Sequence, residues 1–212
     1  MKDGIRLVCF DLDKTLIKGN SWYELNLAIG VTENEDALMF SWYEDGIITY
    51  QQWIDLITSI AKKRGKASRV LIEEVLARYA YVPGARDVIQ YVKERGYMVA
   101  LISGSTDILV NKVGRELGIS YVAANNRLVF NDEGMLEKIV THGQDDQAKL
   151  HLLQGFCKEL DISITECACI GDGDNDRELF LKSGKGITFE GSKIQNIAWK
   201  TVAEIISIKD FL

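Results

Sequence analysis

Two aspartates, Asp11 and Asp13, stand one residue apart directly after the short apolar run 5–10. Because side chains alternate along a strand, these two acids leave the end of a strand on the same side. Two like charges held together are costly unless a cation or a shared proton compensates them. The pair therefore predicts a site, and the site that suits it best is a hard divalent cation beside a phosphate.

The same pair can divide the work of phosphoryl transfer between its members. One carboxylate can take a phosphoryl group and hold it as an aspartyl-phosphate. An acid two residues on can protonate the leaving oxygen and then activate the water that hydrolyses the intermediate. The alternative is two solvated acids that cap the next helix, and the pair alone supports both interpretations about equally.

Two further segments offer phosphate-binding chemistry. Ser103-Gly104-Ser105 follows an apolar run, and a hydroxyl with free backbone N–H groups before a helix forms a phosphate cradle. An ordinary turn with a helix-capping serine explains the same residues and is favoured for this segment alone. Lys149 lies in the first turns of a predicted helix, where a cation opposes the helix dipole. A phosphate in front of it would explain that position, although a solvated surface lysine is the commoner case.

The fourth segment is acidic and glycine-rich, Gly171-Asp172-Gly173-Asp174-Asn175-Asp176. Its alternating acids suggest a calcium loop of the EF-hand type. However, Arg177 stands where that loop needs glycine, and Ser183 where it needs glutamate. The glycines instead let the backbone bend so that Asp172 faces the end of the preceding strand. An acidic loop that caps a helix is the alternative.

All four segments lie at ends of predicted strands or starts of predicted helices. Strand-like runs alternate with helical patterns along most of the chain, and a hairpin is expected over residues 128–140. This alternation predicts an α/β fold with a doubly wound, Rossmann-like parallel sheet. Ligands bind such sheets beyond the carboxyl ends of the strands, where the polar segments are expected.

Residues 17–82 interrupt the alternation. They are helical by pattern, contain three of the four tryptophans, and end before Pro83-Gly84. We predict a helical cap domain over residues 17–82, inserted into a core formed by residues 1–16 and 83–212. The aromatic residues of this cap could line a substrate pocket, but a small helical domain also needs large side chains for its own core, which is the favoured interpretation.

Composition limits the partners. The chain has 212 residues, 47% of them hydrophobic, and a net charge of -6, which argues against a nucleic-acid binder. No stretch approaches the roughly 20 apolar residues of a membrane span, and residues 1–4 lack the start of a signal sequence. We expect a cytoplasmic protein without membrane or nucleic-acid partners. The sequence contains no signal for its oligomeric state.

In their order along the chain, the four motifs resemble those of the haloacid dehalogenase-like (HAD) hydrolases. Asp11-Leu12-Asp13-Lys14-Thr15 matches the first motif, D-x-D-x-T, Ser103 the second and Lys149 the third. Residues 171–176 match the fourth, G-D-G-x-N-D. The cap resembles the C1 type, and the motif details resemble the phosphoserine phosphatase branch. The resemblance extends over essentially the whole chain.

The resemblance implies a role for each matched residue in a magnesium-dependent phosphatase. Asp11 would be the nucleophile and a Mg²⁺ ligand. Asp13 would be the general acid and base, with its backbone carbonyl on the metal. Thr15 would support the loop that carries them. Ser103 and the Gly104 N–H would bind phosphate.

The remaining matched residues would complete the charge balance. Lys149 would bind phosphate and neutralise charge on the nucleophile. Asp172 would be the third protein ligand of Mg²⁺, and Asn175 and Asp176 would orient the ligands. These parts supply what phosphoryl transfer requires, which is in-line positioning and charge neutralisation.

Substrate recognition departs from the branch. Asn20 stands where those enzymes carry an acid for the substrate ammonium, with Glu24 the nearest acid, and residues 50–55 lack the expected arginine. We therefore predict a phosphomonoester hydrolase for a small phosphorylated metabolite other than phosphoserine. A phosphotransferase that passes the aspartyl-phosphate to an acceptor alcohol, and a non-catalytic binding protein on the same fold, are the alternatives.

Overall fold

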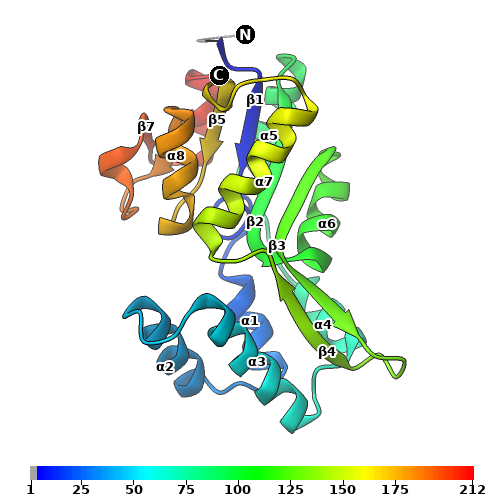
Figure 1. The fold of residues 1–212 in the computed structure, drawn as a ribbon. Coiled ribbons are helices and arrows are strands. Elements are labelled where there is room, and N and C mark those ends of the chain that lie inside the picture. The colour runs from blue at the N-terminus through cyan, green and yellow to red at the C-terminus, as the bar shows by residue number, and fades with distance from the viewer. Residues whose placement is uncertain (1–3) are drawn as a thin grey trace.

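The computed structural model describes residues 4–212, so the first three residues of the predicted core segment lie outside it. A seven-stranded sheet runs through the molecule in the order β4-β3-β2-β1-β5-β6-β7 (Figure 1). Its strands are β1 Leu7–Phe10, β2 Met98–Thr106, β3 Tyr121–Phe130, β4 Leu136–Thr141, β5 Cys167–Ile170, β6 Gly186–Phe189 and β7 Lys200–Val202. All neighbouring strands are parallel except β3 and β4.

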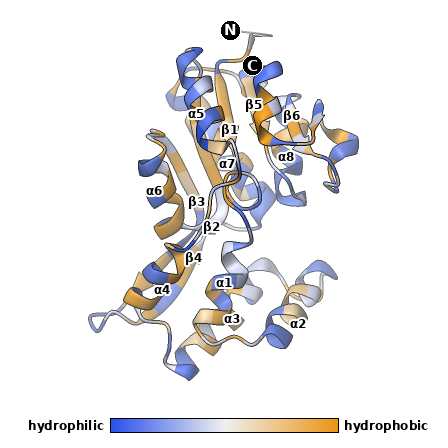
Figure 2. Cartoon of the chain, turned by 180° about the vertical axis from the view of Figure 1, so that it is seen from behind, coloured by the Kyte–Doolittle hydropathy of each residue, from blue (hydrophilic) through white to orange (hydrophobic). Residues whose placement is uncertain are grey.

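Strand β1 lies at the centre of the sheet and pairs with β2 on one side and β5 on the other. All four of its residues are buried, as expected for a parallel strand covered on both faces. Figure 2 shows this strand in the colour of hydrophobic residues. Val8 and Phe10 face the core that includes α5 (Ala85–Glu94) and α6 (Asp107–Glu116). Leu7 and Cys9 face the core that includes α7 (Asp145–Glu159) and α8 (Arg177–Ser183). The predicted doubly wound α/β fold is confirmed.

Between β1 and α5 the chain forms four helices, α1 Ser21–Ala28, α2 Glu33–Glu44, α3 Tyr50–Arg64 and α4 Arg69–Leu76. Thr32 and Thr49 begin α2 and α3 with capping boxes, which satisfy the free N–H groups of the first turns. The β3–β4 hairpin of the core reaches this helical segment, because Leu136 N donates to Ala67 O at 2.8 Å. The helices lie below the carboxyl ends of the central strands in Figure 1.

Two strands are longer than the apolar runs and the hairpin pattern of the sequence indicate. Strand β2 continues through Ser103-Gly104-Ser105 to Thr106, with a register shift against β3 between Ser103 and Thr106. Strand β3 runs over ten residues, pairing first with β2 and then with β4. Because Asn125 and Asn126 interrupt its apolar pattern, the first half of β3 was not predicted as a strand. The remaining short elements are the 3₁₀ helices Ile164–Glu166, Asp174–Asp176, Gln195–Ile197 and Ile205–Asp210.

We expect Gly186→Ala to lower the free energy of unfolding by about 1–3 kcal/mol. A Cβ at this first residue of β6 would lie 2.1 Å from Cγ of the buried Phe180 and 2.7 Å from its Cβ, so the ring must move. Gly155→Ala is the matched control, because Gly155 lies within α7 and a methyl group added there would enter open space. That change should raise stability by about 0.5–1 kcal/mol. Chemical denaturation of both variants measures the difference, and equal midpoints would contradict it.

Candidate active site

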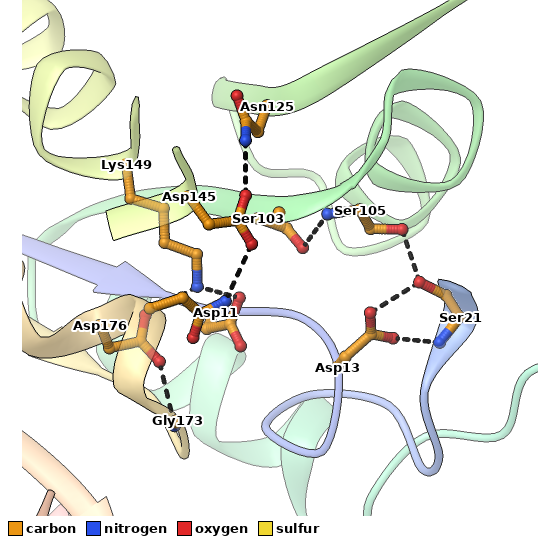
Figure 3. A network of polar contacts seen from close by, with 12 residues as sticks. Asp11, Asp13, Ser21, Ser103, Ser105, Asn125, Asp145, Lys149, Gly173 and Asp176 are labelled. Atoms are coloured by element: carbon orange, nitrogen blue, oxygen red, sulfur yellow. Dashed lines mark hydrogen bonds and ion pairs between the residues drawn. The ribbon is translucent and has the colours of Figure 1, made fainter. Parts of the chain in front are cut away.

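Four chain segments meet beyond the carboxyl ends of β1, β2 and β5 (Figure 3). Asp11 and Asp13 follow β1, Ser103 lies in the last part of β2, and Asp172 follows β5. Lys149 comes from the second turn of α7. The structure thus brings the four predicted motifs together at one edge of the sheet, as the topology requires.

Lys149 is fully buried and forms two ion pairs. Its Nζ donates to Asp11 Oδ1 at 2.7 Å and to Asp176 Oδ1 at 2.8 Å. Burial by itself lowers the pKa of Lys149, but the carboxylates of Asp11, Asp176 and Asp145 outweigh it and hold the pKa above its usual range. Lys149 is therefore charged at neutral pH, and the alternative of a solvated surface lysine is excluded.

Three carboxylates form an acidic cluster at the site. Single oxygens of Asp11, Asp172 and Asp176 lie within 4.8 Å of one another. Burial, and then the charge of Asp11, raises the pKa of Asp172 to about 6. Burial also raises the pKa of Asp176, against the opposing effect of Lys149. One lysine does not compensate three acids, and hard carboxylate oxygens at this spacing fit a hard divalent cation.

The cluster differs in membership from the predicted ligand set. The carboxylate of Asp13 is not in it, which leaves only the backbone carbonyl of Asp13 for the metal role that we expected. Asp176, expected to orient the ligands, contributes an oxygen to the cluster and bonds Lys149 as well. Its position depends on Gly171, because a Cβ there would lie 2.0 Å from Asp176 Oδ2.

Asp13 turns away from the cluster toward the start of α1. Its Oδ1 accepts from Ser21 N at 3.0 Å and its Oδ2 from Ser21 Oγ at 2.6 Å. Ser21 Oγ also lies 2.6 Å from Ser105 Oγ. Burial raises the pKa of Asp13 to about 6, although the hydrogen bonds from Ser21 act in the opposite direction. A carboxyl with this pKa exchanges a proton near neutral pH, as a general acid and base must.

The Ser103-Gly104 segment is held by hydrogen bonds that span the chain. Ser103 Oγ accepts from Ser105 N at 3.0 Å. The Gly104 carbonyl accepts from Trp22 Nε1 at 2.9 Å and from Asn126 Nδ2 at 2.7 Å. With its carbonyl held from two sides, the peptide is fixed in orientation. The sequence did not indicate this role of Asn126, because a polar residue within a strand does not by itself reveal its hydrogen-bond partner.

Asp145 is a half-buried acid that the sequence did not indicate. Its carboxylate accepts from Asn125 Nδ2 at 2.5 Å and from Asn175 Nδ2 at 3.3 Å. It packs closely against Gly104, where an added Cβ would lie 2.0 Å from Asp145 Oδ2. Asn175 therefore bonds Asp145 and not the acidic cluster. Asp145 has amide donors, and burial raises its pKa.

Thr15 and the predicted specificity residues occupy different positions. Thr15 is fully buried in the loop after β1, where its N–H donates to Leu12 O at 3.3 Å, and its Oγ1 lacks a partner within residues 4–212. Asn20 lines the cavity, but its side-chain oxygen caps α1 by accepting from the N–H groups of Trp22 and Tyr23. Glu24 is exposed on α1 and is not among the described residues that line the cavity.

A cavity of about 1430 Å³ lies between helices α1–α3 and the strand ends. Its floor includes Asp11, Asp13, Ser103, Gly104 and Asp172. Six aromatic residues of α1–α3 line the cavity, and four of them, which we call the aromatic wall, contact one another: Trp22, Tyr43, Tyr50 and Trp53. The centroids of the contacting rings lie 5.4–6.2 Å apart. The aromatic residues thus serve both as packing for the helices and as lining for the cavity.

Comparison with known proteins identifies relatives over most of the chain. Residues 8–181 match the family model of haloacid dehalogenase-like hydrolases. The phosphoserine phosphatase of Methanocaldococcus jannaschii is 30% identical over 184 residues, which are 87% of this chain and 85% of that protein. The phosphoserine phosphatase of Archaeoglobus fulgidus is 28% identical over 89% of this chain, which spans about half of that protein (54%).

Solved structures agree with the sequence matches. A substrate-bound phosphoserine phosphatase has a TM-score of 0.81 at 27% identity and covers 98% of this chain and 99% of its own. A phospho-aspartyl intermediate analogue of phosphoserine phosphatase has a TM-score of 0.78 at 28% identity, covering 94% of both chains. No helix within residues 4–212 is long and apolar enough to cross a membrane. The chain therefore belongs to the haloacid dehalogenase-like hydrolase family, and its relatives place it among the phosphatases of that family.

Proposed function

We propose that this protein is a Mg²⁺-dependent phosphomonoester hydrolase that works through an aspartyl-phosphate on Asp11. The observation that carries the proposal is the fully buried Lys149, which bonds Asp11 at 2.7 Å beside the acidic cluster. A fully buried lysine needs anionic partners, because without them its charge would be more stable in solvent. Its position therefore supports an anionic reaction centre at Asp11.

Asp11 is the nucleophile in this proposal. Lys149 donates to its Oδ1, which leaves Oδ2 to attack phosphorus. The Ser103 hydroxyl and the Gly104 N–H receive phosphate oxygens, and Lys149 neutralises their charge. Asp11, Asp172 and the Asp13 carbonyl would hold Mg²⁺. When bound, the ion supplies further neutralisation and aligns the phosphate.

Asp13 moves the protons. In its neutral form it donates a proton to the leaving oxygen as the ester bond breaks. The resulting carboxylate then accepts a proton from the water that attacks the aspartyl-phosphate, which releases phosphate and restores Asp13. Its two hydrogen bonds from Ser21 fix the orientation of the carboxyl group during both steps.

The substrate in this proposal is a small phosphorylated metabolite other than phosphoserine. Asn20 uses its side-chain oxygen to cap α1, and the exposed Glu24 is not among the described residues that line the cavity. The residues that line the cavity from α1–α3 include no arginine for a substrate carboxylate. Specificity therefore rests on other side chains of the cavity.

Replacing the nucleophile tests the chemistry. We expect Asp11→Asn to lower kcat on p-nitrophenyl phosphate with Mg²⁺ by on the order of 10³-fold or more, because an amide does not attack phosphorus. Asp132→Asn is the matched control, since Asp132 is exposed in the β3–β4 turn and should keep the wild-type rate. Equal rates in Asp11→Asn and wild type would exclude Asp11 as the nucleophile. Inactive wild type would exclude the proposed function.

Replacing the acid and base separates the two steps. We expect Asp13→Asn to lower turnover by about 10²–10⁴-fold and to accumulate protein carrying one phosphoryl group. An aryl leaving group departs without a proton, whereas the attack of water still needs the base. The substitution should therefore slow hydrolysis of the aspartyl-phosphate more than its formation. Mass spectrometry of acid-quenched protein measures the intermediate. Turnover lost with no phosphoprotein would contradict this division of roles.

Metal dependence follows from the acidic cluster. A chelator should abolish activity and added Mg²⁺ should restore it. Asp172→Asn should raise the Mg²⁺ concentration for half-maximal rate roughly tenfold or more, because one anionic oxygen is lost. Asp174→Asn is the control, since Asp174 lies outside the cluster and makes only surface ion pairs. Equal Mg²⁺ requirements in the two variants would remove Asp172 from the ligand set.

A further inference from the structure

The cavity has an unusual distribution of charge on the side that faces the phosphate site. Residues 20–53 contribute aromatic, polar and acidic side chains to its lining and, within the described chain, no lysine, arginine or histidine. An alcohol bearing a carboxylate or a second phosphate would meet no cation there. This side of the cavity therefore disfavours an anionic leaving group.

The cavity as a whole is also negative. Nine carboxylates and three cationic side chains line it. Two of the cations are already compensated, because Lys193 lies 3.8 Å from Glu44 and 3.9 Å from Asp174, and Arg177 lies 3.7 Å from Asp174. A divalent metal and a dianionic phosphate together add no net charge. The negative potential therefore remains when both are bound, and it attracts a cation.

The aromatic wall offers this cation a surface. Trp22 Nε1 donates to the Gly104 carbonyl, and Tyr50 OH accepts from Asn126, which bonds the same carbonyl. The wall therefore begins next to the phosphate-binding peptide, where a short alcohol attached to phosphorus must lie. Faces of Trp and Tyr rings attract ammonium groups, by about 0.5–2 kcal/mol depending on desolvation.

Tyr43 of the aromatic wall lies in the electrostatic field of the cavity acids. Burial, and then the charges of Asp145, Asp146 and Glu44, raise the pKa of Tyr43 to about 12. The field that opposes a negative charge on this phenol favours a positive charge beside it.

Asn26 supplies a directional acceptor. It is fully buried, lines the cavity, and donates from Nδ2 to Asp36 Oδ1 at 2.7 Å. That bond fixes the orientation of the amide, and it leaves Oδ1 without a donor among residues 4–212. An unsatisfied buried acceptor costs about 1–3 kcal/mol, and an N–H from a ligand would remove that cost.

We propose that the substrate is the phosphomonoester of a short cationic amino alcohol that carries no carboxylate. Its ammonium group lies against the aromatic wall among Glu44, Asp145 and Asp146, and its N–H donates toward Asn26. This assignment deepens the proposed function and rests on it, since it concerns the leaving alcohol of the same reaction.

The test compares three substrates that differ in charge at similar size, using the full chain with Mg²⁺. We expect kcat/KM for O-phosphoethanolamine to exceed that for ethyl phosphate by about tenfold or more, which corresponds to one desolvated cation–π contact. It should also exceed that for O-phosphoserine, which adds a carboxylate. Equal values for O-phosphoethanolamine and ethyl phosphate, or a preference for O-phosphoserine, would overturn the assignment.

p-Nitrophenyl phosphate separates this proposal from the one on which it rests. Turnover of the aryl ester without preference for the amino alcohol refutes only the substrate class. No turnover of any ester, with correctly folded protein, refutes the phosphatase itself.

Two pairs of variants locate the recognition. Tyr43→Leu should reduce the ratio of kcat/KM values for O-phosphoethanolamine over ethyl phosphate about fivefold, whereas Tyr43→Phe keeps the ring and should keep the ratio. Glu44→Gln should reduce the ratio as well, because it removes one carboxylate from the cavity and one of the two partners of Lys193. Glu74→Gln is the matched control, exposed on α4 and outside the cavity lining. An unchanged ratio in Tyr43→Leu and Glu44→Gln would overturn the assignment.

Discussion

The ion network around Lys149 constrains the rest of the structure. A lysine with no exposed surface is tolerated only because Asp11 and Asp176 compensate its charge, and removing one partner of such a buried pair costs about 3–5 kcal/mol. The network joins α7 to the loops after β1 and β5, which lie 138 and 27 residues away from Lys149 along the chain. Any fold of this sequence that separates these segments leaves a buried charge unpaired. The network therefore specifies the relative positions of the helices and strands that form the site.

Close packing around these charges explains two of the glycines. Asp176 lies against Gly171, and Asp145 lies against Gly104, each at a distance that a Cβ would fill. In both places a carboxylate packs directly against the backbone, fully buried at Asp176 and half-buried at Asp145, and the loss of solvent raises the pKa of each acid. The glycines thus serve less as flexible hinges than as space for side chains. An alanine at either position would move a charged group and not merely strain a turn.

The sequence predicted the parts of the site that depend on local order. Asp11, Asp13, Ser103 and Asp172 follow apolar runs, so the rule for parallel sheets was enough to bring them together. Ser21, Asn126 and Asp145 were missed because their partners lie 8, 22 and 20 or more residues away along the chain. A polar residue inside a strand, such as Asn126, looks like a break in the pattern until the groups that it satisfies are known. The family resemblance supplied roles for the matched residues and drew attention to Asn20 and residues 50–55, but it gave no role to Ser21, Asn126 or Asp145.

The two halves of the cavity are subject to different physical constraints. The floor is built from strand ends and a buried ion network, where each charge fixes the others, so its composition cannot change one residue at a time. The helices α1–α3 are held mainly by apolar packing, which accepts substitution when volume is conserved. Asn20 can therefore stand in place of an acid, and residues 50–55 can lack an arginine, while the contacts of Lys149 stay the same. In the function that we propose, a change of substrate therefore requires changes only in the lining from α1–α3, while the ion network around Lys149 is kept.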